Sequence, residues 1–369
     1  MKTAFAAALA LSASTLACAQ SSVNLFGTVD LYVAHARSGS SSWTKLEDGG
    51  NTASRFGFRG SEDLGGGLEA HFLLEAGYSP DTGNGNLPGP SIAFTRQSFV
   101  GLSGPWGQLD AGRMYTPLFF TLFRGDPYGV NSVFSPLILA FQNDAQPGAL
   151  GLAARASNMV RYRTPAKSDF FADIAYAPGE SGEQSHRSGD VYGASVGWSH
   201  KPYYISYAFQ RSRSGSATAP VAQPSTTTHQ AVSGAYEWAD LRLYATYSTS
   251  SASIPIVASL PGLPGVQGVF GSTRAPRSRT ASLGAQYTIT PTSNVLFEVV
   301  QRKVSDSNRA QLAWTLGYDY LLSKRTALYG RLLKLENRNK AAVSLAGVRV
   351  AANSGDDVRV IAAGIRHHF

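Results

Sequence analysis

The stretch of sequence that decides the fold is Val358-Arg359-Val360-Ile361-Ala362-Ala363-Gly364-Ile365-Arg366-His367-His368-Phe369. Every second position back from Phe369 is mostly apolar, whereas the positions between them carry Arg366 and His368. Because successive side chains of a β-strand point to opposite faces, one face of this segment is largely apolar. A last amphipathic strand with a terminal Phe is typical of transmembrane β-barrels, whose strands present apolar atoms to lipid along their whole length. We therefore predict an all-β transmembrane barrel and assign Phe369 a role in its assembly.

The start of the chain predicts export. An apolar run that reaches Leu16 follows Lys2 and leads into the small residues Ala17-Cys18-Ala19, which is the pattern of a secretory signal and its cleavage site. We expect a signal peptide at 1–19 and a single domain at 20–369. A lipid anchor on Cys18 is the weaker interpretation, because the leucine and the small residue before it are out of their usual order. Cleavage after Ala19 removes the only cysteine, so no disulfide is expected although the chain enters an oxidising compartment.

The composition allows either a globular all-β protein or a membrane barrel. Removal of the signal, whose only charged residue is Lys2, leaves 350 residues and lowers the formal net charge from +8 to +7. Aromatic residues make up 11% of the chain and charged residues 15%, values that do not separate the two classes. After the signal no uninterrupted apolar stretch approaches about 18 residues, which argues against a helical membrane anchor. Periodicity has to decide, because the alternation of a barrel escapes hydropathy scans.

Alternation of apolar and polar residues marks about sixteen strand-like segments. In the first of them Val23, Leu25 and Val29 share one face while Asn24 and Thr28 share the other, which is the period of two of a strand. The segments lie near residues 23–33, 55–59, 68–78, 94–102, 107–115, 158–164, 169–177, 190–199, 202–211, 229–238, 240–250, 279–290, 293–303, 309–322, 325–336 and 357–369. An even number places both ends of an antiparallel barrel at one rim. Sixteen strands leave a lumen wide enough for water, whereas about eight would be filled by side chains.

The connections between these segments alternate in length. Short turns such as Gly65–Gly67 are interleaved with long polar stretches such as 212–228 and 251–278. One rim of turns and one rim of loops is the asymmetry of an outer-membrane barrel. A secreted soluble all-β protein would also alternate, but it would not need so many strands closed by an apolar last one. Segment 325–336 has apolar residues on both faces, which indicates either a bulge or burial against a neighbouring subunit.

Six motifs spread over the exported part of the chain carry a resemblance to a known family. They read Ser54-Arg55-Phe56-Gly57-Phe58-Arg59-Gly60-Ser61-Glu62-Asp63-Leu64-Gly65-Gly66-Gly67-Leu68-Glu69-Ala70, Thr95-Arg96-Gln97-Ser98-Phe99-Val100-Gly101-Leu102-Ser103, Leu109-Asp110-Ala111-Gly112-Arg113-Met114-Tyr115, Val160-Arg161-Tyr162-Arg163-Thr164-Pro165, Leu322-Ser323-Lys324-Arg325-Thr326 and Gly364-Ile365-Arg366-His367-His368-Phe369. The set resembles the general porins of β-proteobacteria, the family that includes the Burkholderia, Comamonas and Neisseria porins. The first and last motifs are the most specific.

The resemblance implies a sixteen-stranded barrel, usually a homotrimer, that passes small hydrophilic solutes and ions by diffusion. It also implies that the third external loop, here about 116–157, folds into the lumen and narrows it. The length of this segment argues independently for more than a simple connection. The chain departs from the family at Met114 and Thr116, where a polar residue and an acid are commoner, and this leaves the path of the loop open.

Arginines on the early segments are the candidate selectivity residues, because the charges that line a constriction select ions by sign. The candidates for a basic wall are Arg55, Arg59, Arg96, Arg113, Arg161 and Arg163, and those for the acidic side on the loop are Asp126 and Asp144. The resemblance places the arginines that match Arg55, Arg96 and the Arg161 segment opposite the third loop. With a net charge near +7 and few acids on the loop, we predict a mild preference for anions. The alternative is that these arginines only line a wet wall, where charged side chains are cheaply tolerated.

Two other functional classes stand beside a general channel. A substrate-specific channel would need aromatic residues along its lumen, and such residues occur near the loop at Tyr115, Phe119, Phe120, Phe123 and Tyr128. An outer-membrane hydrolase would need Ser, His and an acid or amide together. Ser195 lies in a Gly-x-Ser-x-Gly motif, but inside an alternating segment instead of at a turn between strand and helix. We expect no enzymatic activity, no cofactor and no metal site.

The positive charge is spread over segments and loops, which argues against nucleic-acid binding. Arginines that flank the long loops suggest instead a contact with anionic lipopolysaccharide. They are Arg211, Arg213, Arg274, Arg277 and Arg279. The expected partners are therefore outer-membrane lipid, lipopolysaccharide, further copies of the same chain, and small hydrophilic solutes.

Overall fold

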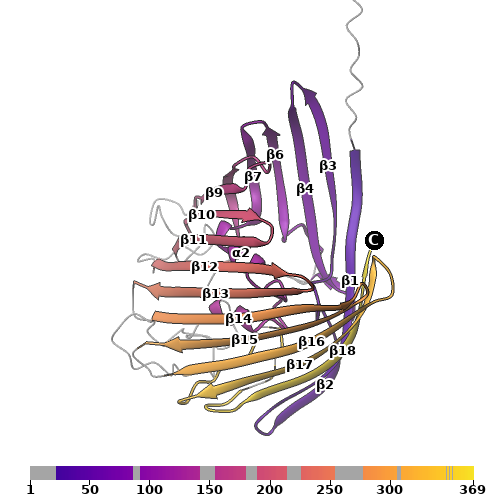
Figure 1. Cartoon of the computed structure of the whole chain (residues 1–369), viewed down its shortest axis with the longest axis vertical. Coiled ribbons are helices and arrows are strands. Elements are labelled where there is room, and N and C mark those ends of the chain that lie inside the picture. Colours follow the sequence, from indigo (N-terminus) through magenta and orange to yellow (C-terminus); the bar gives the residue numbers. More distant parts are fainter. Residues whose placement is uncertain are drawn as a thin grey trace, which may run out of the picture.

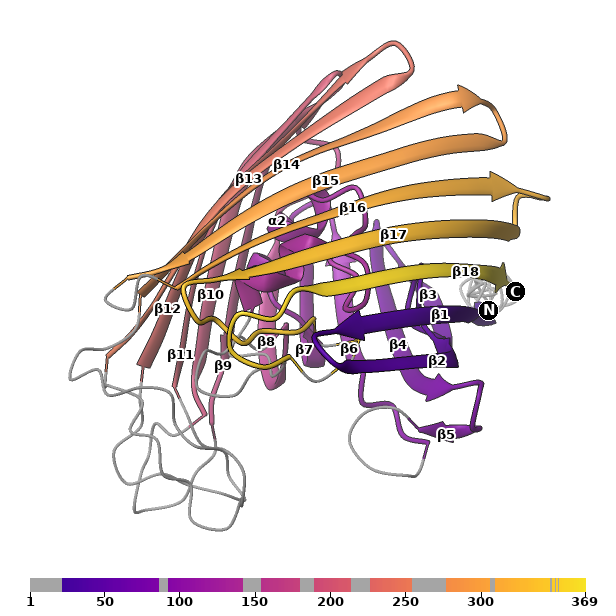
Figure 2. The same cartoon turned by 90° about the horizontal axis from the view of Figure 1, so that it is seen from below.

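A closed antiparallel sheet forms the wall of the molecule. The computed structural model describes residues 22–85, 92–141, 154–179, 189–213, 226–253, 277–305, 309–345, 347–348, 350 and 352–369. The strands of the closed wall are β1 (Ser22–Ser38), β3 (Arg55–Gly65), β4 (Leu68–Ser79), β6 (Gln97–Gly104), β7 (Gly107–Tyr115), β8 (Arg155–Arg163), β9 (Phe170–Ala177), β10 (Val191–His200), β11 (Tyr203–Arg213), β12 (Thr226–Trp238), β13 (Leu241–Ala252), β14 (Arg277–Thr290), β15 (Ser293–Val304), β16 (Ala310–Leu321), β17 (Thr326–Arg338) and β18 (Val358–His368). Figures 1 and 2 show them following one another in chain order, with helix α2 on the concave side.

The first strand closes the cylinder. β1 pairs with β18 on one side and with β3 on the other, and both pairings are antiparallel. Gly27 and Phe369 each donate a backbone N–H to the carbonyl oxygen of the other at 3.1 Å, which extends the ladder to Phe369. A closed ladder leaves no open sheet edge in the hydrocarbon layer, where an unsatisfied backbone group is costly. The predicted sixteen-stranded antiparallel barrel is confirmed. The predicted signal peptide at 1–19 lies outside the described residues.

Two short strands are added to the wall. β1 is long enough to pair with β3 through Ser22–Thr28 and then with β2 (Ser41–Asp48) through its second half. β5 (Asn84–Gly85) pairs with the end of β4. The sequence does not reveal β2, because Trp43 and Leu46 fall on opposite faces and the segment lacks a regular apolar period.

The two rims of the barrel differ. At one rim each connection between wall strands is short, and the longest is the turn 164–169 between β8 and β9. The opposite rim carries the long connections, among them the first loop (39–54) and the third (116–154). In outer-membrane barrels the short turns face the periplasm and the long loops face outward. The end with the short turns is called the periplasmic rim, and the end with the long loops is called the external rim.

The strands alternate between exposed apolar residues and buried ones. Leu283 and Ile361 point outward and are 65% and 57% exposed, whereas the adjacent Ser282 and Val360 are only 3% and 4% exposed. This is the pattern that a wall between lipid and an interior requires. None of the helices in the described part of the chain is long and apolar enough to cross a membrane.

The third loop begins with a short helix on the inner wall. Helix α2 (Pro117–Arg124) starts at Thr116, whose hydroxyl accepts a hydrogen bond from Phe119 N at 3.3 Å, and proline occupies its first turn. Ser/Thr caps followed by proline favour a helix start. The helix packs against β9 to β12. Thr121 Oγ1 lies 2.9 Å from Ser206 Oγ of β11, and Thr246 Oγ1 of β13 donates to Gly125 O at 3.1 Å. The helix is therefore bound to the inner face of the wall.

The rest of the described third loop forms an apolar core inside the barrel. A 3-10 helix, η1 (Pro136–Phe141), is buried throughout and packs against β13 to β16. Residues of β17 and of the loop before β18 complete this core, including Leu333, Leu335, Val343 and Leu345. The pairings of β17 show no register shift on either side. Segment 325–336 therefore has no bulge: its inward apolar residues are buried against the chain's own loops, whereas the outward Leu328 and Leu332 are exposed.

We predict that Phe134 holds the third loop against the wall. Its side chain is fully buried, and its ring lies 5.4 Å from the ring of Tyr32 on β1. Phe134→Ala should weaken docking of the loop by about 3–5 kcal/mol, while the barrel, held by its ladder, still forms. The measurement is the rate of tryptic cleavage after Arg124, which is exposed on α2. Phe123→Ala deletes the same side chain at a 45% exposed position and should change the rate little; equal rates in the two variants would contradict the prediction.

Candidate functional site

Two arginines share one buried carboxylate on the inner wall. Glu75 of β4 binds Arg55 of β3, with Arg55 Nε 3.3 Å from Glu75 Oε2, and Arg96, with Nε 2.7 Å from Glu75 Oε1. Arg96 is not part of a strand; it lies in a bend immediately before β6, where its own backbone N–H donates to Glu75 O at 3.1 Å. Glu75 and Arg96 are both buried, so their charges are paired as burial requires.

Tyr115 joins these arginines to the start of the third loop. Its phenol oxygen accepts hydrogen bonds from Arg96 Nη2 at 2.9 Å and from Arg155 Nη2. The guanidinium of Arg155 also lies over the Tyr115 ring at 4.0 Å from its centre, a favourable cation–π geometry. The ring of Tyr115 also stacks on the ring of Phe119 in α2, with ring centres 4.1 Å apart. The third loop is thereby anchored at the residue that precedes it.

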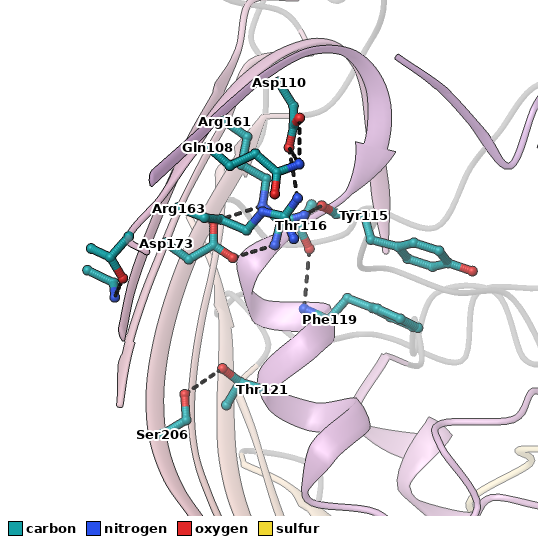
Figure 3. Close-up of polar contacts among 12 residues, drawn as sticks. Gln108, Asp110, Tyr115, Thr116, Phe119, Thr121, Arg161, Arg163, Asp173 and Ser206 are labelled. Atoms are coloured by element: carbon teal, nitrogen blue, oxygen red, sulfur yellow. Dashed lines mark hydrogen bonds and ion pairs between the residues drawn. The ribbon is translucent and has the colours of Figure 1, made fainter. Parts of the chain in front are cut away.

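Two further arginines extend the basic wall across β7, β8 and β9 (Figure 3). Arg161 makes a bidentate ion pair with Asp173 of β9. It also donates a hydrogen bond to Tyr115 O at 3.2 Å, and its guanidinium lies 4.7 Å from the centre of the Phe120 ring. Arg163 binds Asp110 of β7, with Nη2 2.9 Å from Oδ2.

Asp110 has additional partners. It lies 2.8 Å from His71 Nε2 and accepts a hydrogen bond from Gln108. Unlike the buried Arg161, the side chain of Arg163 is 35% exposed. Arg163 therefore presents its charge to solvent although it is ion-paired.

The contact network has more cations than carboxylates. We call it the arginine wall and define it as the guanidinium groups of Arg55, Arg96, Arg155, Arg161 and Arg163 with the carboxylates of Glu75, Asp110 and Asp173. The five arginines exceed the three acids by two charges. An excess of one sign on a low-dielectric wall raises the local concentration of ions of the opposite sign.

A cavity lies directly beside this wall, on the periplasmic side of α2. Its volume is about 1090 Å³, and Phe120, Thr121 and Arg124 of the helix line it together with Arg161 and Arg163. Residues of the turn 164–169 and of the turn between β6 and β7 form its far side. The part of the arginine wall formed by Arg161, Arg163 and Asp173 therefore borders open space inside the barrel.

Two of the predicted basic-wall residues do not join the network. Arg59 lies on the inner face of β3, but it is exposed and its guanidinium lies 5.5 Å from the centre of the Phe26 ring. Arg113 lies on the other face of β7 from Asp110. It donates to Thr95 O at 2.5 Å and to Ser157 Oγ at 2.9 Å. Its parity, shared with Leu109 and Ala111, places it away from the lumen.

Asp126, one of the two residues predicted for the acidic side of the constriction, does not contact the arginine wall. Asp126 is buried within the third loop, where it accepts hydrogen bonds from Tyr128 N at 2.7 Å, Val130 N at 2.5 Å and Ser135 Oγ at 2.6 Å. The carboxyl group of Glu298, on β15, lies beside it. Burial raises the pKa of Asp126 above its ordinary value, although the three donated hydrogen bonds oppose this shift. Asp144 lies outside the described residues.

Sequence reasoning missed one basic residue and the acids that pair with the wall. Asp110 and Asp173 lie on the inward parity of β7 and β9, so strict alternation could have identified them. Arg155 begins β8 opposite Tyr115, beyond a register shift at which β8 has two residues, Ser157 and Asn158, against one of β7. Such a shift cannot be read from alternation, because the bulged strand loses its period.

The other chemical possibilities find little support in the described residues. Ser195 lies within β10 and is buried, with no turn into a helix after it. The described part of the chain contains no group of three or more His, Cys, Asp or Glu side chains that could hold a metal ion. Most of the loop aromatics pack on one another or on arginines, as Tyr115, Phe119 and Phe120 do, and Tyr128 is buried.

A closed transmembrane barrel with a charged inner wall and an open cavity is a channel of the bacterial outer membrane. The comparisons with known proteins define this class further. The chain belongs to the Gram-negative porin family, whose model matches residues 4–340.

Individual relatives agree with this assignment over nearly the whole length. The chain is 34% identical to outer membrane porin protein 32 of Delftia acidovorans over 378 residues, which covers 100% of both chains. It is 28% identical to an outer membrane porin protein of Bordetella pertussis over 375 residues, 89% of this chain and 92% of that one. The solved structure of an anion-selective porin from Comamonas acidovorans superposes with a TM-score of 0.81 and 28% identity, covering 95% of this chain and 100% of that chain.

We predict that docking of the third loop depends on pH through Asp126. The pKa of Asp126 is higher in the docked loop than in the undocked loop, where this carboxyl has its ordinary pKa of 3.8. Docking should therefore be strongest in acid and weaken as the pH rises above that value through the raised pKa. The measurement is the mobility of a spin label attached through Phe123→Cys on α2, which should increase with pH. Asp126→Asn, which cannot ionise, should flatten the profile; an unchanged profile in that variant would refute the role of Asp126.

Proposed function

We propose that this porin is a passive, water-filled diffusion channel with a preference for anions. The single observation that carries the proposal is the excess of five guanidinium groups over three carboxylates in the arginine wall. Three residues of this wall, Arg161, Arg163 and Asp173, line a cavity of about 1090 Å³, so their field acts on open space inside the barrel. Rings of charge at close range select ions by sign. The similar porin from Comamonas acidovorans is anion-selective, which agrees with this proposal.

The third loop supplies the constriction in this proposal. Its described part, including α2 and η1, lies against the inner face of β9 to β16. Arg161 touches Phe120 of the helix, so the basic wall and the loop meet at one level of the barrel. We infer that segment 116–157 narrows the lumen there. Arg59 lies outside the arginine wall. In this proposal its charge only makes the path from the periplasmic rim to the wall more positive.

We further propose a homotrimer embedded in outer-membrane lipid and lipopolysaccharide, reached after removal of residues 1–19, with Phe369 acting in assembly. The porin resemblance supports this assembly. The hydrogen bonds between Phe369 and Gly27 support a role for the last residue in closing the barrel.

Native mass spectrometry of protein in detergent should give three chains per particle, and a monomer that retains full conductance would contradict the trimer.

A substrate-specific channel is the alternative class. It would need aromatic side chains free to contact a passing ligand, whereas most of the loop aromatics are engaged in packing. The proposal involves no chemical step. Turnover in a hydrolase assay, or conductance that saturates with one solute, would favour the rival classes.

The preference for anions is tested by reversal potentials in a salt gradient across a planar bilayer. We expect the wild type to favour anions and Arg163→Gln to lower the permeability ratio of anions to cations roughly two- to fivefold, because a partly exposed charge beside the cavity is lost. Arg113→Gln is the matched control: it removes the same charge from the other face of β7 and should leave the ratio unchanged. Cation preference in the wild type, or equal effects of the two variants, would overturn the proposal.

A further inference from the structure

Like charges face each other directly on the outer surface near the external rim. Arg279 of β14 and Lys303 of β15 are cross-strand partners, and both side chains are exposed on the outward face. Arg277 follows on the same face of β14, two residues nearer the external rim, and is also exposed. Side chains of directly opposed residues lie about 5 Å apart at Cβ. Three cations are therefore concentrated on two adjacent strands.

This arrangement costs stability unless an anion offsets it. Like charges placed opposite each other in a sheet repel, and no ion pair connects Arg277, Arg279 or Lys303 to a carboxylate among the described residues. Other outward or rim cations are neutralised by the chain itself. Lys334 has Glu336 at 2.7 Å, and Arg213 has Asp190 at 3.2 Å.

A second opposed pair differs in its surroundings. Arg37 of β1 faces Arg359 of β18 across the seam of the barrel. Asp357 precedes Arg359 by two residues, on the same face of the chain, and already lies 3.8 Å from Lys334. The pair on β14 and β15 has no such acid near it in the described part of those strands.

The residues around the cluster fit a phosphate group attached to an apolar body. On β13, Thr249 lies opposite Arg279 and Ser251 lies opposite Arg277, so hydroxyl groups flank the cations. Farther from the external rim the outward surface is apolar, with Tyr247 49% exposed and Leu283 65% exposed. Guanidinium and hydroxyl donors bind phosphate oxygens, while the tyrosine and leucine below suit acyl chains.

We propose that Arg277, Arg279 and Lys303 form a binding site for the phosphorylated headgroup of lipopolysaccharide, which we call the outer phosphate site. This inference deepens the lipopolysaccharide contact of the proposed function and rests on it. Of the rim arginines that the sequence suggests, Arg213 is paired with Asp190, and Arg274 lies outside the described residues. The register of β14 and β15 instead adds Lys303, which the sequence pattern alone does not connect with the arginines. A phosphate bound between the strands removes the repulsion between Arg279 and Lys303.

The experiment compares binding of diphosphorylated lipid A and of the same lipid without its phosphates to purified protein in detergent. The wild type should prefer the phosphorylated lipid. The double variant Arg279→Ser/Lys303→Ser should lose about 30-fold of that affinity, since each basic residue near an anionic lipid surface contributes about 1 kcal/mol. Binding of the dephosphorylated lipid should be unaffected. Lys303→Arg should retain the preference, because it conserves the charge.

The control is Lys324→Ser/Arg325→Ser, which removes the same two charges from the exposed turn at the periplasmic rim. It should bind lipid A as the wild type does. Equal loss in both double variants would show a general effect of net charge and overturn the site, as would unchanged binding in the first variant. Phosphatidylglycerol that binds the wild type as strongly as phosphorylated lipid A does, and loses affinity equally in the first double variant, would overturn the assignment to lipopolysaccharide. Single-channel conductance of each variant should equal that of the wild type, which separates a failed lipid site from a failed channel and confirms folding.

Discussion

The structure depends on one constraint: a backbone inside a lipid layer has no water to bond with. Each peptide group must find its partner within the sheet, and a sheet satisfies this only if it closes on itself. β1 makes closure possible because it pairs with β18 along one edge and with β3 along the other. Once the cylinder is closed, alternation follows, since each strand has one face toward lipid and one toward the interior. Closure with sixteen strands also leaves an interior wide enough for water, which closure with about eight would not.

The interior is organised by a second, ordinary hydrophobic effect. The third loop does not hang freely in the lumen, because its apolar residues pack against inward-facing side chains of several strands. Phe134 and Leu137 are as buried as core residues of a soluble domain. This core fixes one side of the channel and leaves open space on the other, where the cavity beside the arginine wall lies. Part of the arginine wall, with Arg161 and Arg163, thus faces open space inside the barrel.

Charge is distributed in two different ways on the two faces of the barrel. Inside, the buried arginines are held by carboxylates, because an isolated charge in a low-dielectric environment is costly. Glu75 serves two arginines and Asp110 serves Arg163 and His71, so neutralisation is incomplete and a positive field remains. Outside, the cations of the outer phosphate site have no acid of their own in the described strands. The arginine wall suits anions that move through the barrel, and the outer phosphate site suits a phosphate group that stays bound.

The sequence by itself determined the barrel, its even number of strands and the asymmetry of its rims, because alternation and turn length are local properties of the chain. Of the six arginines that it proposed for a basic wall at the constriction, Arg55, Arg96, Arg161 and Arg163 make ion pairs in the arginine wall, whereas Arg59 and Arg113 do not join it. Only the tertiary structure decided that Arg155 belongs to the wall and that Asp126 is buried within the loop. A bulge shifts parity without a signal in the sequence, and a loop takes its path from contacts with distant strands. Both depend on partners that lie far away along the chain, which a pattern of period two cannot encode.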